Sequence, residues 1–317
     1  MNNRVLVVGS GNMAIEYVKV LRDLNIEFDV VGRSEAGAAR FLDQTGFDAV
    51  SGGIDRFIET NGLAAYSHCI VATNVCQLYE NTMALLNAGA TSLLVEKPCV
   101  LDEQELESLN ERAQSTGANV FIAYNRRFFS SVIRAKEIIA EDGGLNLVKF
   151  DFTEWAHVIG GLEKDPREKQ RWLLANSTHI IDLAFHFAGV PTELSTYTSG
   201  SLDWHPASQT FSGAGRSETG TLISYGSDWG SASRWWLELF TPKRKLRLCP
   251  VETLTETMKG TVKEVPVEFE NDPDIKFKPG IYRQTQAFVT GKSQTLCALE
   301  ELERAFPSYL KIANYEQ

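Results

Sequence analysis

Short apolar runs alternate with amphipathic stretches over the first part of the chain. The runs RVLVVG, FDVVGR, HCIVATN, TSLLVEK and NVFIAYN are rich in β-branched residues and bounded by polar or glycine residues, which predicts strands. Apolar positions recur with helical spacing over residues 13–24, 36–44, 75–87 and 103–115. This alternation predicts right-handed βαβ units and a parallel sheet covered by helices on both faces.

The rhythm changes after Tyr124. Residues 130–139 and 168–187 have helical patterns, whereas residues 192–269 are rich in Thr, Ser and Gly and alternate between apolar and polar positions. That alternation predicts a large, mostly antiparallel sheet with one open face. We therefore expect an N-terminal α/β domain over residues 1–124 and a C-terminal α+β domain over residues 125–317.

Composition limits the protein's partners. With 317 residues, 43% of them hydrophobic, the chain is long enough for a core in each of two domains. A net charge of −10 disfavours nucleic acid, because an acidic surface repels phosphate backbones. The five cysteines lack disulfide or zinc spacing, and no apolar run reaches the ~18 residues of a membrane span. We expect a soluble cytoplasmic protein with no membrane partner and no metal.

The first predicted strand leads directly into the segment GSGNMA, which carries the pattern G-x-G-x-x-A at Gly9, Gly11 and Ala14. In dinucleotide-binding proteins the first glycine allows a tight turn, the second lets the backbone approach a pyrophosphate, and the small third residue lets helix and strand pack closely. The following helix, starting near Asn12 and Met13, would direct its N-terminus at the anion. This context predicts a Rossmann domain that binds a dinucleotide.

The end of the second predicted strand bears on the choice of cofactor. An acidic residue there would bind the ribose 2′-hydroxyl of NAD. This chain has Gly32, Arg33 and Ser34 at that point, and Asp29 falls earlier, inside the strand. A guanidinium and a hydroxyl group suit the 2′-phosphate of NADP. The sequence therefore favours NADP, with NAD as the alternative cofactor and a solvated loop arginine as the alternative role of Arg33.

Two ionisable residues follow an apolar strand in the segment SLLVEKP. Glu96 and Lys97 would lie at the carboxyl end of that strand, where ligands bind in open parallel sheets, and Pro98 fixes the chain after them. Thr73 and Asn74 occupy the corresponding end of the preceding strand. Ionised groups beside an apolar run are costly unless paired or used. We expect these polar residues to face the cofactor, the alternative being a surface Glu–Lys pair that stabilises little.

Four ordered segments, which span residues 7–183, resemble motifs of the Gfo/Idh/MocA oxidoreductases, the family of the glucose–fructose oxidoreductases and inositol dehydrogenases. They are VVGSGNMA, VEKP, YNRRF (residues 124–128) and HIIDL (residues 179–183). The resemblance implies a Rossmann domain followed by a domain with a large open antiparallel sheet. It also implies hydride transfer between NAD(P) and a sugar, polyol or nucleotide-sugar at a hydroxyl or ketone carbon.

Within this resemblance, Lys97 is an acid/base beside the reacting oxygen and Glu96 lies close to the nicotinamide ribose. Lysine suits that role, because its amine can take or give the hydroxyl proton and its ammonium form stabilises developing alkoxide charge. The Lys97–Pro98 peptide bond is often cis in such proteins. We also expect a homodimer or homotetramer formed through the C-terminal sheet, since an exposed apolar face tends to be covered.

His179 is the second candidate for proton transfer. On a helix, His179, Asp182 and His186 fall within an arc of ~60° where the apolar face meets a polar one. The alternatives are a structural hydrogen bond to Asp182 and, with no further ligand in the sequence, a metal site. Family members with a Lys–Asp–His set carry the aspartate where this chain has Ala175. Lys97 and His179 would therefore carry the proton chemistry, and a non-catalytic cofactor-binding sensor on the same fold is the alternative function.

The remaining candidates concern the substrate. Either Arg126 or Arg127 would bind an anionic substrate group, the alternative being an ion pair with a helix carboxylate. Trp155 belongs to a segment with the Trp, His and Gly of a substrate-facing loop, and a place in the core is its alternative. We expect the substrate site to be lined by Tyr124, Asn125, Arg126, Arg127, Trp155, Asn176, His179 and Asp182.

Overall fold

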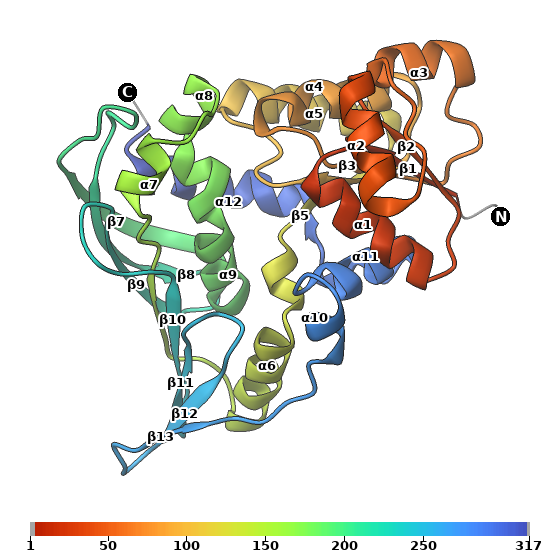
Figure 1. Cartoon of the computed structure of the whole chain (residues 1–317). Coiled ribbons are helices and arrows are strands. Elements are labelled where there is room, and N and C mark those ends of the chain that lie inside the picture. The colour runs from red at the N-terminus through yellow and green to blue at the C-terminus, as the bar shows by residue number, and fades with distance from the viewer. Residues whose placement is uncertain (1–3, 316–317) are drawn as a thin grey trace. The chain divides into compact units, whose positions relative to one another are not determined.

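The computed structural model describes residues 4–315, and the chain divides into two compact units (Figure 1). The first unit comprises Met1–Asn125 and Pro273–Leu302, and the second comprises Arg126–Asp272 and Glu303–Gln317. The predicted boundary at residue 124 lies next to the first division. The predicted second domain differs from the second unit, however, because the chain returns to the first unit after residue 272.

Long-range contacts hold the returning segment in the first unit. Its short strand β14 (Cys297–Ala298) pairs with β5 (Asn119–Ala123) at the edge of the sheet. Its helix α11 (Ile281–Val289) packs on α1 (Asn12–Asp23), and Phe288 of α11 is buried against His68 and Phe121. These contacts join residues far apart in the sequence, so no local pattern predicts them.

The sheet of the first unit has the strand order β14-β5-β4-β3-β1-β2, and β1 to β5 are parallel. Its central strands are apolar because helices cover both faces: Val7 pairs with Val30 and Ile70, and all three are buried. The strands predicted from the apolar runs are confirmed. They are β1 (Val5–Val8), β2 (Phe28–Val31), β3 (His68–Val71), β4 (Ser92–Glu96) and β5.

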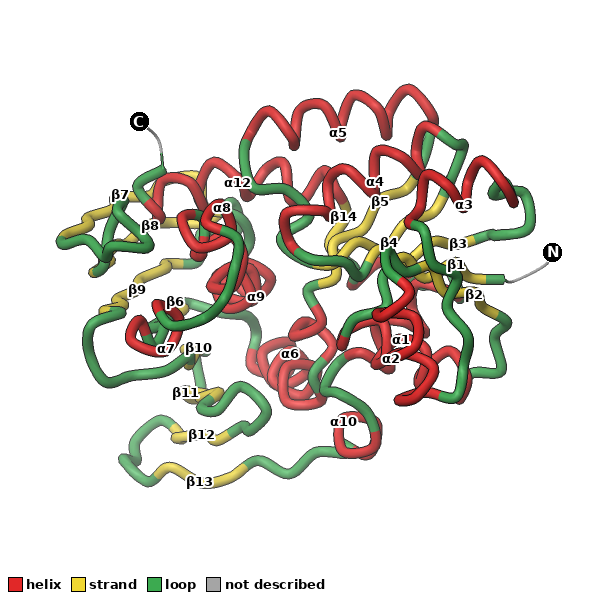
Figure 2. The backbone as a smooth tube through the Cα atoms, turned by 45° about the horizontal axis from the view of Figure 1, so that its top comes forward, coloured by secondary structure: helices red, strands yellow, loops and turns green. Residues whose placement is uncertain are grey.

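Helices α4 and α5 lie on one face of this sheet and α1 on the other (Figure 2). The predicted helices are confirmed to within a few residues, but α3 was not predicted, because glycines open and follow it and its apolar face is short. Besides α1 and α11, the helices here are α2 (Glu35–Thr45), α3 (Gly53–Asn61), the 3₁₀ turn Val75–Gln77, α4 (Leu78–Asn87), α5 (Glu103–Thr116), α10 (Asp272–Lys276) and the 3₁₀ turn Ser293–Thr295.

The second unit contains the predicted large, mostly antiparallel sheet, in the order β13-β12-β11-β10-β6-β9-β8-β7. The β6–β9 pair is parallel and joins two antiparallel halves. Helix α9 (Thr178–Ala188) packs on β6 and β10 and covers one face. The strands are β6 (Leu147–Asp151), β7 (Pro191–Ser199), β8 (Thr210–Ser217), β9 (Leu222–Asp228), β10 (Trp236–Phe240), β11 (Arg244–Leu248), β12 (Thr255–Met258) and β13 (Glu264–Pro266).

The helix predicted over residues 168–187 is interrupted. Helix α8 ends at Gln170, a π-helical turn follows at Leu173–Ser177, and α9 begins only at Thr178. π-helical turns often mark functional sites, and a helical pattern in the sequence does not distinguish them from a regular helix. The other helical segments here are the 3₁₀ turn Asn125–Phe128, α6 (Ser130–Asp142), α7 (Ala156–Gly160), α8 (Pro166–Gln170) and α12 (Leu299–Ala313), which the division crosses.

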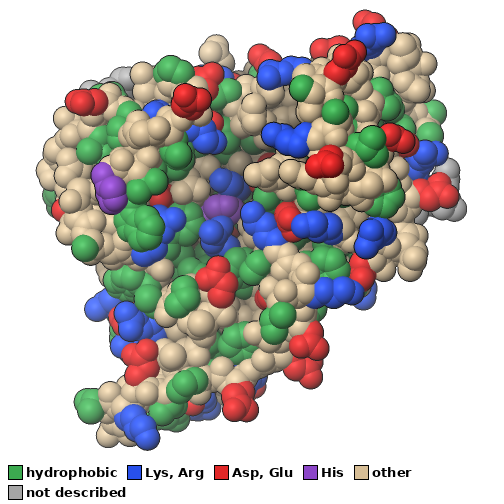
Figure 3. All heavy atoms as spheres, in the orientation of Figure 1, with side chains coloured by type: hydrophobic (Ala, Val, Ile, Leu, Met, Phe, Trp, Pro, Cys, Tyr) green, Lys and Arg blue, Asp and Glu red, His purple; other side chains and the backbone are tan. Residues whose placement is uncertain are grey.

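A row of polar side chains crosses the outer face of this sheet. Lys149 is exposed between Val148 and Phe150, which are buried, and it pairs in register with Ser224 and Glu238. On the side of the molecule seen in Figure 3, Lys and Arg side chains lie among Asp and Glu side chains. Oligomerisation through the sheet stays a prediction. It was based on an exposed apolar face, and this row of residues is polar.

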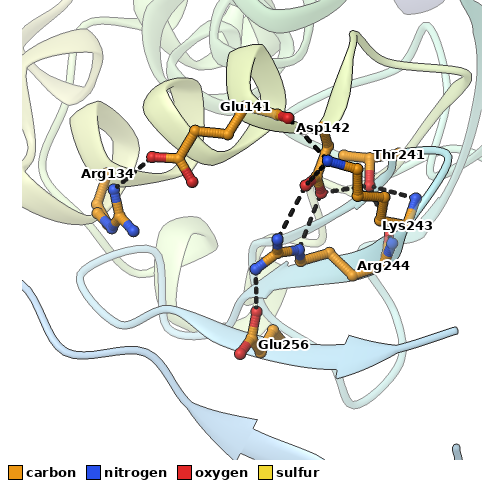
Figure 4. A network of polar contacts seen from close by, with 7 residues as sticks. All are labelled: Arg134, Glu141, Asp142, Thr241, Lys243, Arg244 and Glu256. Carbon is orange, nitrogen blue, oxygen red and sulfur yellow. Dashed lines mark hydrogen bonds and ion pairs between the residues drawn. The ribbon is translucent and has the colours of Figure 1, made fainter.

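A buried carboxylate ties α6 to this sheet (Figure 4). Asp142 accepts hydrogen bonds from Arg244 Nε (2.9 Å) and Nη2 (2.8 Å) and from the Thr241 hydroxyl (2.8 Å), while Arg244 also pairs with Glu256. Burial acts to raise the pKa of Asp142, but these hydrogen bonds and the charges of Arg244 and Lys243 outweigh it and hold the pKa below its ordinary value. Both carboxylate oxygens are satisfied, so the group stabilises packing.

Candidate active site

The glycine loop has the geometry that a dinucleotide requires. Gly9, directly after β1, has a φ of +122°, and a Cβ there would lie 2.3 Å from the carbonyl oxygen of Ala72. Only glycine fits this position. A Cβ at Gly11 would meet nothing within 4 Å, so space is open beside the backbone at that point. Ala14 is fully buried, as close packing of α1 on the sheet demands.

The N-terminus of α1 is suited to an anion. Gly11 caps the helix without a side-chain hydrogen bond, and its first turn contains no acidic residue. The first amides of a helix need an acceptor, and the helix dipole favours negative charge there. Asn12 is exposed and Met13 half-buried at this end. These residues therefore fit the pyrophosphate of a dinucleotide.

Hydroxyl groups gather at the end of β2. Ser34 caps α2 by accepting a hydrogen bond from the Gly37 amide (3.1 Å), which leaves its own proton free to donate. Ser10, from the glycine loop, lies so close that its Oγ would be 2.6 Å from a Cβ at Gly32. Arg33 is exposed beside them. This set of donors can bind a phosphate.

Asp29 is occupied elsewhere. Its carboxylate pairs with Arg4 (2.8 Å) and accepts a hydrogen bond from the Tyr66 hydroxyl (2.6 Å). At the end of β3, the Thr73 hydroxyl accepts a hydrogen bond from Asn81 (3.1 Å), and Asn74 is exposed. The predicted cofactor residues from β1, β2 and β3 thus all lie at the carboxyl ends of neighbouring parallel strands.

Glu96 is a buried carboxyl group at the end of β4. It is 8% exposed and accepts a hydrogen bond from the Tyr17 hydroxyl of α1 (2.7 Å). Burial raises its pKa, while the Tyr17 hydrogen bond and the charges of Lys97 and Lys278 act to lower it. Burial also raises the pKa of Tyr17 well above its ordinary value. Glu96 is therefore a paired internal group, which excludes the alternative of a surface Glu–Lys pair.

Lys97 follows Glu96 and is half-buried, and the Lys97–Pro98 peptide bond is cis. A second lysine approaches the same carboxyl group from the returning segment. Lys278 is exposed, its Nζ donates to the Met13 sulfur (3.2 Å), and its charge lowers the pKa of Glu96. Lys278 thus lies between the glycine loop and the end of β4. No sequence motif indicated it.

Tyr124 and Asn125 are the last residues of the N-terminal segment of the first unit, and both are buried. The Asn125 amide donates to the carbonyl oxygen of Pro279 (2.9 Å), which fixes the returning segment next to Lys278. Both residues were expected to line the substrate site. In the structure, Asn125 has a clear positioning role within the first unit.

The second unit resolves the alternatives for the two arginines. Arg127 is 3% exposed and binds both carboxylate oxygens of Asp182, with Nε 2.9 Å from Oδ2. It is therefore the arginine that pairs with a helix carboxylate. Arg126 instead lies with its guanidinium carbon 4.6 Å from the ring centroid of Trp235. The place of Arg127 and Asp182 in the substrate site stays a prediction, and in the structure the two side chains pair with each other.

His179 lies in the first turn of α9, 8% exposed, with its ring centroid 6.1 Å from that of Trp235. Asp182 is held by Arg127, and His186 Nε2 is 2.7 Å from the Lys136 ammonium. Positive groups thus face two of the three side chains of the alternative metal site. Among residues 4–315, no group of three or more His, Cys, Asp or Glu side chains could hold a metal ion.

A carboxylate lies beside the π-helical turn. Glu154, 1% exposed, accepts hydrogen bonds from Asn176 (2.8 Å) and Ser177 (2.9 Å) and pairs with Arg234 (2.8 Å). Burial raises its pKa, and the charge and hydrogen bond of Arg234 act against that rise. Ala175 is buried in the same turn. A carboxylate from another segment therefore adjoins the turn that lacks an acid at residue 175.

Trp155 and Trp172 differ in their exposure. Trp172 is buried, with its ring edge-on to Trp204 (centroids 6.2 Å apart). Trp155 is 49% exposed, so its core alternative is wrong. Its indole N–H donates to the carbonyl oxygen of Ser233 (3.1 Å). Trp155 is thereby fixed at the surface of the second unit.

Comparison with known proteins agrees with the first unit's geometry. Residues 3–124 match the family described as "Oxidoreductase family, NAD-binding Rossmann fold". Over these residues, the chain matches the Gfo/Idh/MocA oxidoreductases that its sequence motifs resemble. The scyllo-inositol 2-dehydrogenase (NADP(+)) IolW of Bacillus subtilis (strain 168) is 27% identical over 125 residues, which are 38% of this chain and 35% of that protein. The match thus spans about a third of IolW.

Solved structures share the two-domain fold over nearly the whole length of this chain. The UDP-N-acetylglucosamine 3-dehydrogenase GnnA from Acidithiobacillus ferrooxidans is similar over 98% of this chain and 96% of its own, with a TM-score of 0.74 and 15% identity. An oxidoreductase from Agrobacterium radiobacter, in complex with NAD+, L-tartaric acid and magnesium, is similar over 100% and 97%, with a TM-score of 0.79 and 13% identity. At such identities the likeness shows the fold alone.

Sequence reasoning missed several residues of these sites. Ser10 stands inside the glycine pattern and could have been found there. Lys278, Glu154, Arg234 and Trp235 carry no local signal, since their place depends on chain segments that meet only in the fold. Within the described part of the chain, no helix is long and apolar enough to cross a membrane.

Proposed function

We propose that the chain is an NADP-preferring oxidoreductase that transfers a hydride between the nicotinamide and a sugar, polyol or nucleotide-sugar, at a hydroxyl or ketone carbon. The observation that carries the proposal is the place of Lys97, which follows buried Glu96 at the same edge of the sheet as the glycine loop. The family of residues 3–124 supports the cofactor class. The names of IolW and GnnA support a sugar-like substrate.

Lys97 and His179 are the proposed acid/base groups. A bound nicotinamide would supply or accept the hydride. In the oxidative direction, Lys97 would take the proton from the substrate hydroxyl, and in the reductive direction it would return it. Its ammonium form would stabilise negative charge on the oxygen. His179 would hold or relay the same proton, and Asn176, fixed by Glu154, would orient a substrate hydroxyl group.

The preference for NADP rests on the donors at the end of β2. Arg33 and the hydroxyl groups of Ser34 and Ser10 would bind the 2′-phosphate, whereas Asp29, bound by Arg4 and Tyr66, is not available to a ribose hydroxyl. Fluorescence titration with NADPH and NADH tests this directly. We expect Arg33→Ala to weaken NADPH binding by about tenfold or more and to leave NADH binding unchanged. Equal losses for both cofactors would contradict the assignment.

Turnover tests the role of Lys97. A panel of hexoses, inositols and nucleotide-sugars is screened with NADP⁺ and NADPH, and Lys97→Ala is compared with Lys19→Ala, whose exposed amine pairs with Glu16 on α1. We expect Lys97→Ala to lower kcat by about 10² to 10⁴ while NADPH still binds, and Lys19→Ala to match the wild type. Full turnover by Lys97→Ala would refute the mechanism.

A second candidate function is a cofactor-binding sensor without turnover. Ala175, in the position where relatives with a Lys–Asp–His set have an acid, favours it. This candidate requires that NADPH binds with the specificity above while no member of the panel is oxidised or reduced.

A further inference from the structure

Two arginines converge on one indole in the second unit. The guanidinium carbons of Arg126 and Arg234 lie 4.6 Å and 4.7 Å from the ring centroid of Trp235, and Arg234 lies 5.2 Å from that of Trp155. The His179 ring is the next neighbour of Trp235, at 6.1 Å. We call Arg126, Arg234, Trp155 and Trp235 the arginine–tryptophan cluster.

Arg234 is held in place but remains accessible. Its Nη1 pairs with Glu154, and Glu154 is fixed in turn by Asn176 and Ser177. The Arg234 side chain is 48% exposed, whereas that of Glu154 is 2% exposed. A guanidinium that is stacked and anchored at one nitrogen loses little conformational freedom when its other donors bind a ligand. Arg234 is therefore pre-organised.

The cluster also contains a donor without an acceptor. Trp235 is 7% exposed, and within residues 4–315 its indole Nε1 has no hydrogen-bond partner. A buried polar group left unpaired is costly and calls for an explanation. The neighbouring acids cannot supply the acceptor, since Asp182 is bound by Arg127 and Glu154 by Arg234. The indole N–H of Trp235 can therefore donate to a ligand beside His179.

We infer that the arginine–tryptophan cluster binds an oxyanion of the substrate, a carboxylate or a phosphate, next to His179. This inference rests on the proposed function and narrows its substrate class to acidic sugars, namely sugar acids, sugar phosphates and nucleotide-sugars. Guanidinium groups bind both kinds of oxyanion through paired N–H donors. The exposed part of the Arg234 guanidinium and the indole N–H of Trp235 would supply such donors.

Calorimetry of the NADPH-loaded protein tests the inference with D-glucose, D-glucuronate, D-glucose 6-phosphate and UDP-glucose as probes, and turnover is measured on the same four. We expect at least one anionic probe to bind about tenfold or more tighter than D-glucose, and the preferred probe distinguishes carboxylate from phosphate. Arg126→Ala and Arg234→Lys should each lose about tenfold or more of that affinity. Arg304→Ala, which removes an exposed guanidinium paired with Glu218, should bind like the wild type.

Failure of the inference and of the proposed function are distinguishable. If NADPH binds and D-glucose binds as tightly as every anionic probe, the inference is overturned while oxidoreductase activity stands. An anion preference that survives in both Arg126→Ala and Arg234→Lys also overturns it. Anion binding lost in the variants, with no turnover on any probe, supports the cluster but contradicts hydride transfer. Arg126→Ala leaves the Glu154 pair intact, so it tests the cluster even if Arg234→Lys folds poorly.

Discussion

The hydrogen bond between Tyr17 and Glu96 offers a sharp test of the carboxyl group at the end of β4. Tyr17→Phe removes a 2.7 Å bond between a fully buried hydroxyl group and a carboxyl group that is 8% exposed, with little change in shape. A hydrogen bond to a charged group contributes about 1.5–3 kcal/mol to stability. We therefore expect a loss of this size in the free energy of unfolding wherever Glu96 is ionised.

The loss should depend on pH. Burial raises the pKa of Glu96 in the folded state. The ionisation of Glu96 therefore costs stability as the pH rises from the ordinary pKa of glutamate through the raised folded-state pKa. The hydroxyl group of Tyr17 offsets part of this cost. The difference between Tyr17→Phe and the wild type should therefore be small near pH 5, close to the ordinary pKa of glutamate, and grow toward about 1.5–3 kcal/mol at pH 8.

Urea unfolding at both pH values, followed by circular dichroism, measures this difference. Tryptophan fluorescence is unsuitable, because all six tryptophans lie in the second unit. Tyr66→Phe is the matched control: it removes a similar 2.6 Å bond to Asp29, which is 30% exposed and keeps its pair with Arg4. A Tyr17→Phe loss that is equal at pH 5 and pH 8 would refute the raised pKa of Glu96, and no loss at either pH would refute the hydrogen bond itself.

The other predictions concern the loop, the second lysine and the buried network. Gly9→Ala should abolish NADPH binding in fluorescence titration, because its Cβ would lie 2.3 Å from a backbone oxygen. Lys278→Ala should weaken NADPH binding severalfold, because it removes a positive charge beside Glu96. Lys276→Ala is the control, since the amine of Lys276 pairs with Asp23, and it should leave NADPH binding unchanged. Equal effects of the two variants would contradict this role of Lys278. Asp142→Asn should lower the free energy of unfolding in urea by about 3 kcal/mol. Arg134→Ala, which removes a partly exposed ion pair with Glu137, should lower it by only about 0–1 kcal/mol.

Asp142 also predicts an acid limit to stability. Its folded-state pKa lies below the ordinary value, so its contribution is present above that ordinary value and is lost as the pH falls through the folded pKa. Acid unfolding of Asp142→Asn should accordingly begin from a lower stability at neutral pH and change less with pH than that of the wild type.

Several features followed from the sequence because they depend on local chemistry. A run of apolar β-branched residues forms a buried parallel strand wherever helices cover both faces, so β1 to β5 could be predicted from their composition. Gly9 and Gly11 could be predicted because a tight turn toward a pyrophosphate tolerates no side chain at one position and leaves space at the other. The position of Glu96 and Lys97 at the end of a strand could be predicted from the apolar run that precedes them.

The tertiary structure decided what depends on segments distant in the chain. Helical periodicity could not show that Arg127 turns inward to Asp182 while Arg126 stacks on Trp235, since both arginines are adjacent and chemically alike. Nor could it bring Lys278 back to the glycine loop, or Glu154 to the turn around Ala175. The sequence by itself determined the Rossmann domain and its cofactor edge. Folding decided which charged side chains meet at that edge and which lie beside His179, because their partners come from other segments of the chain.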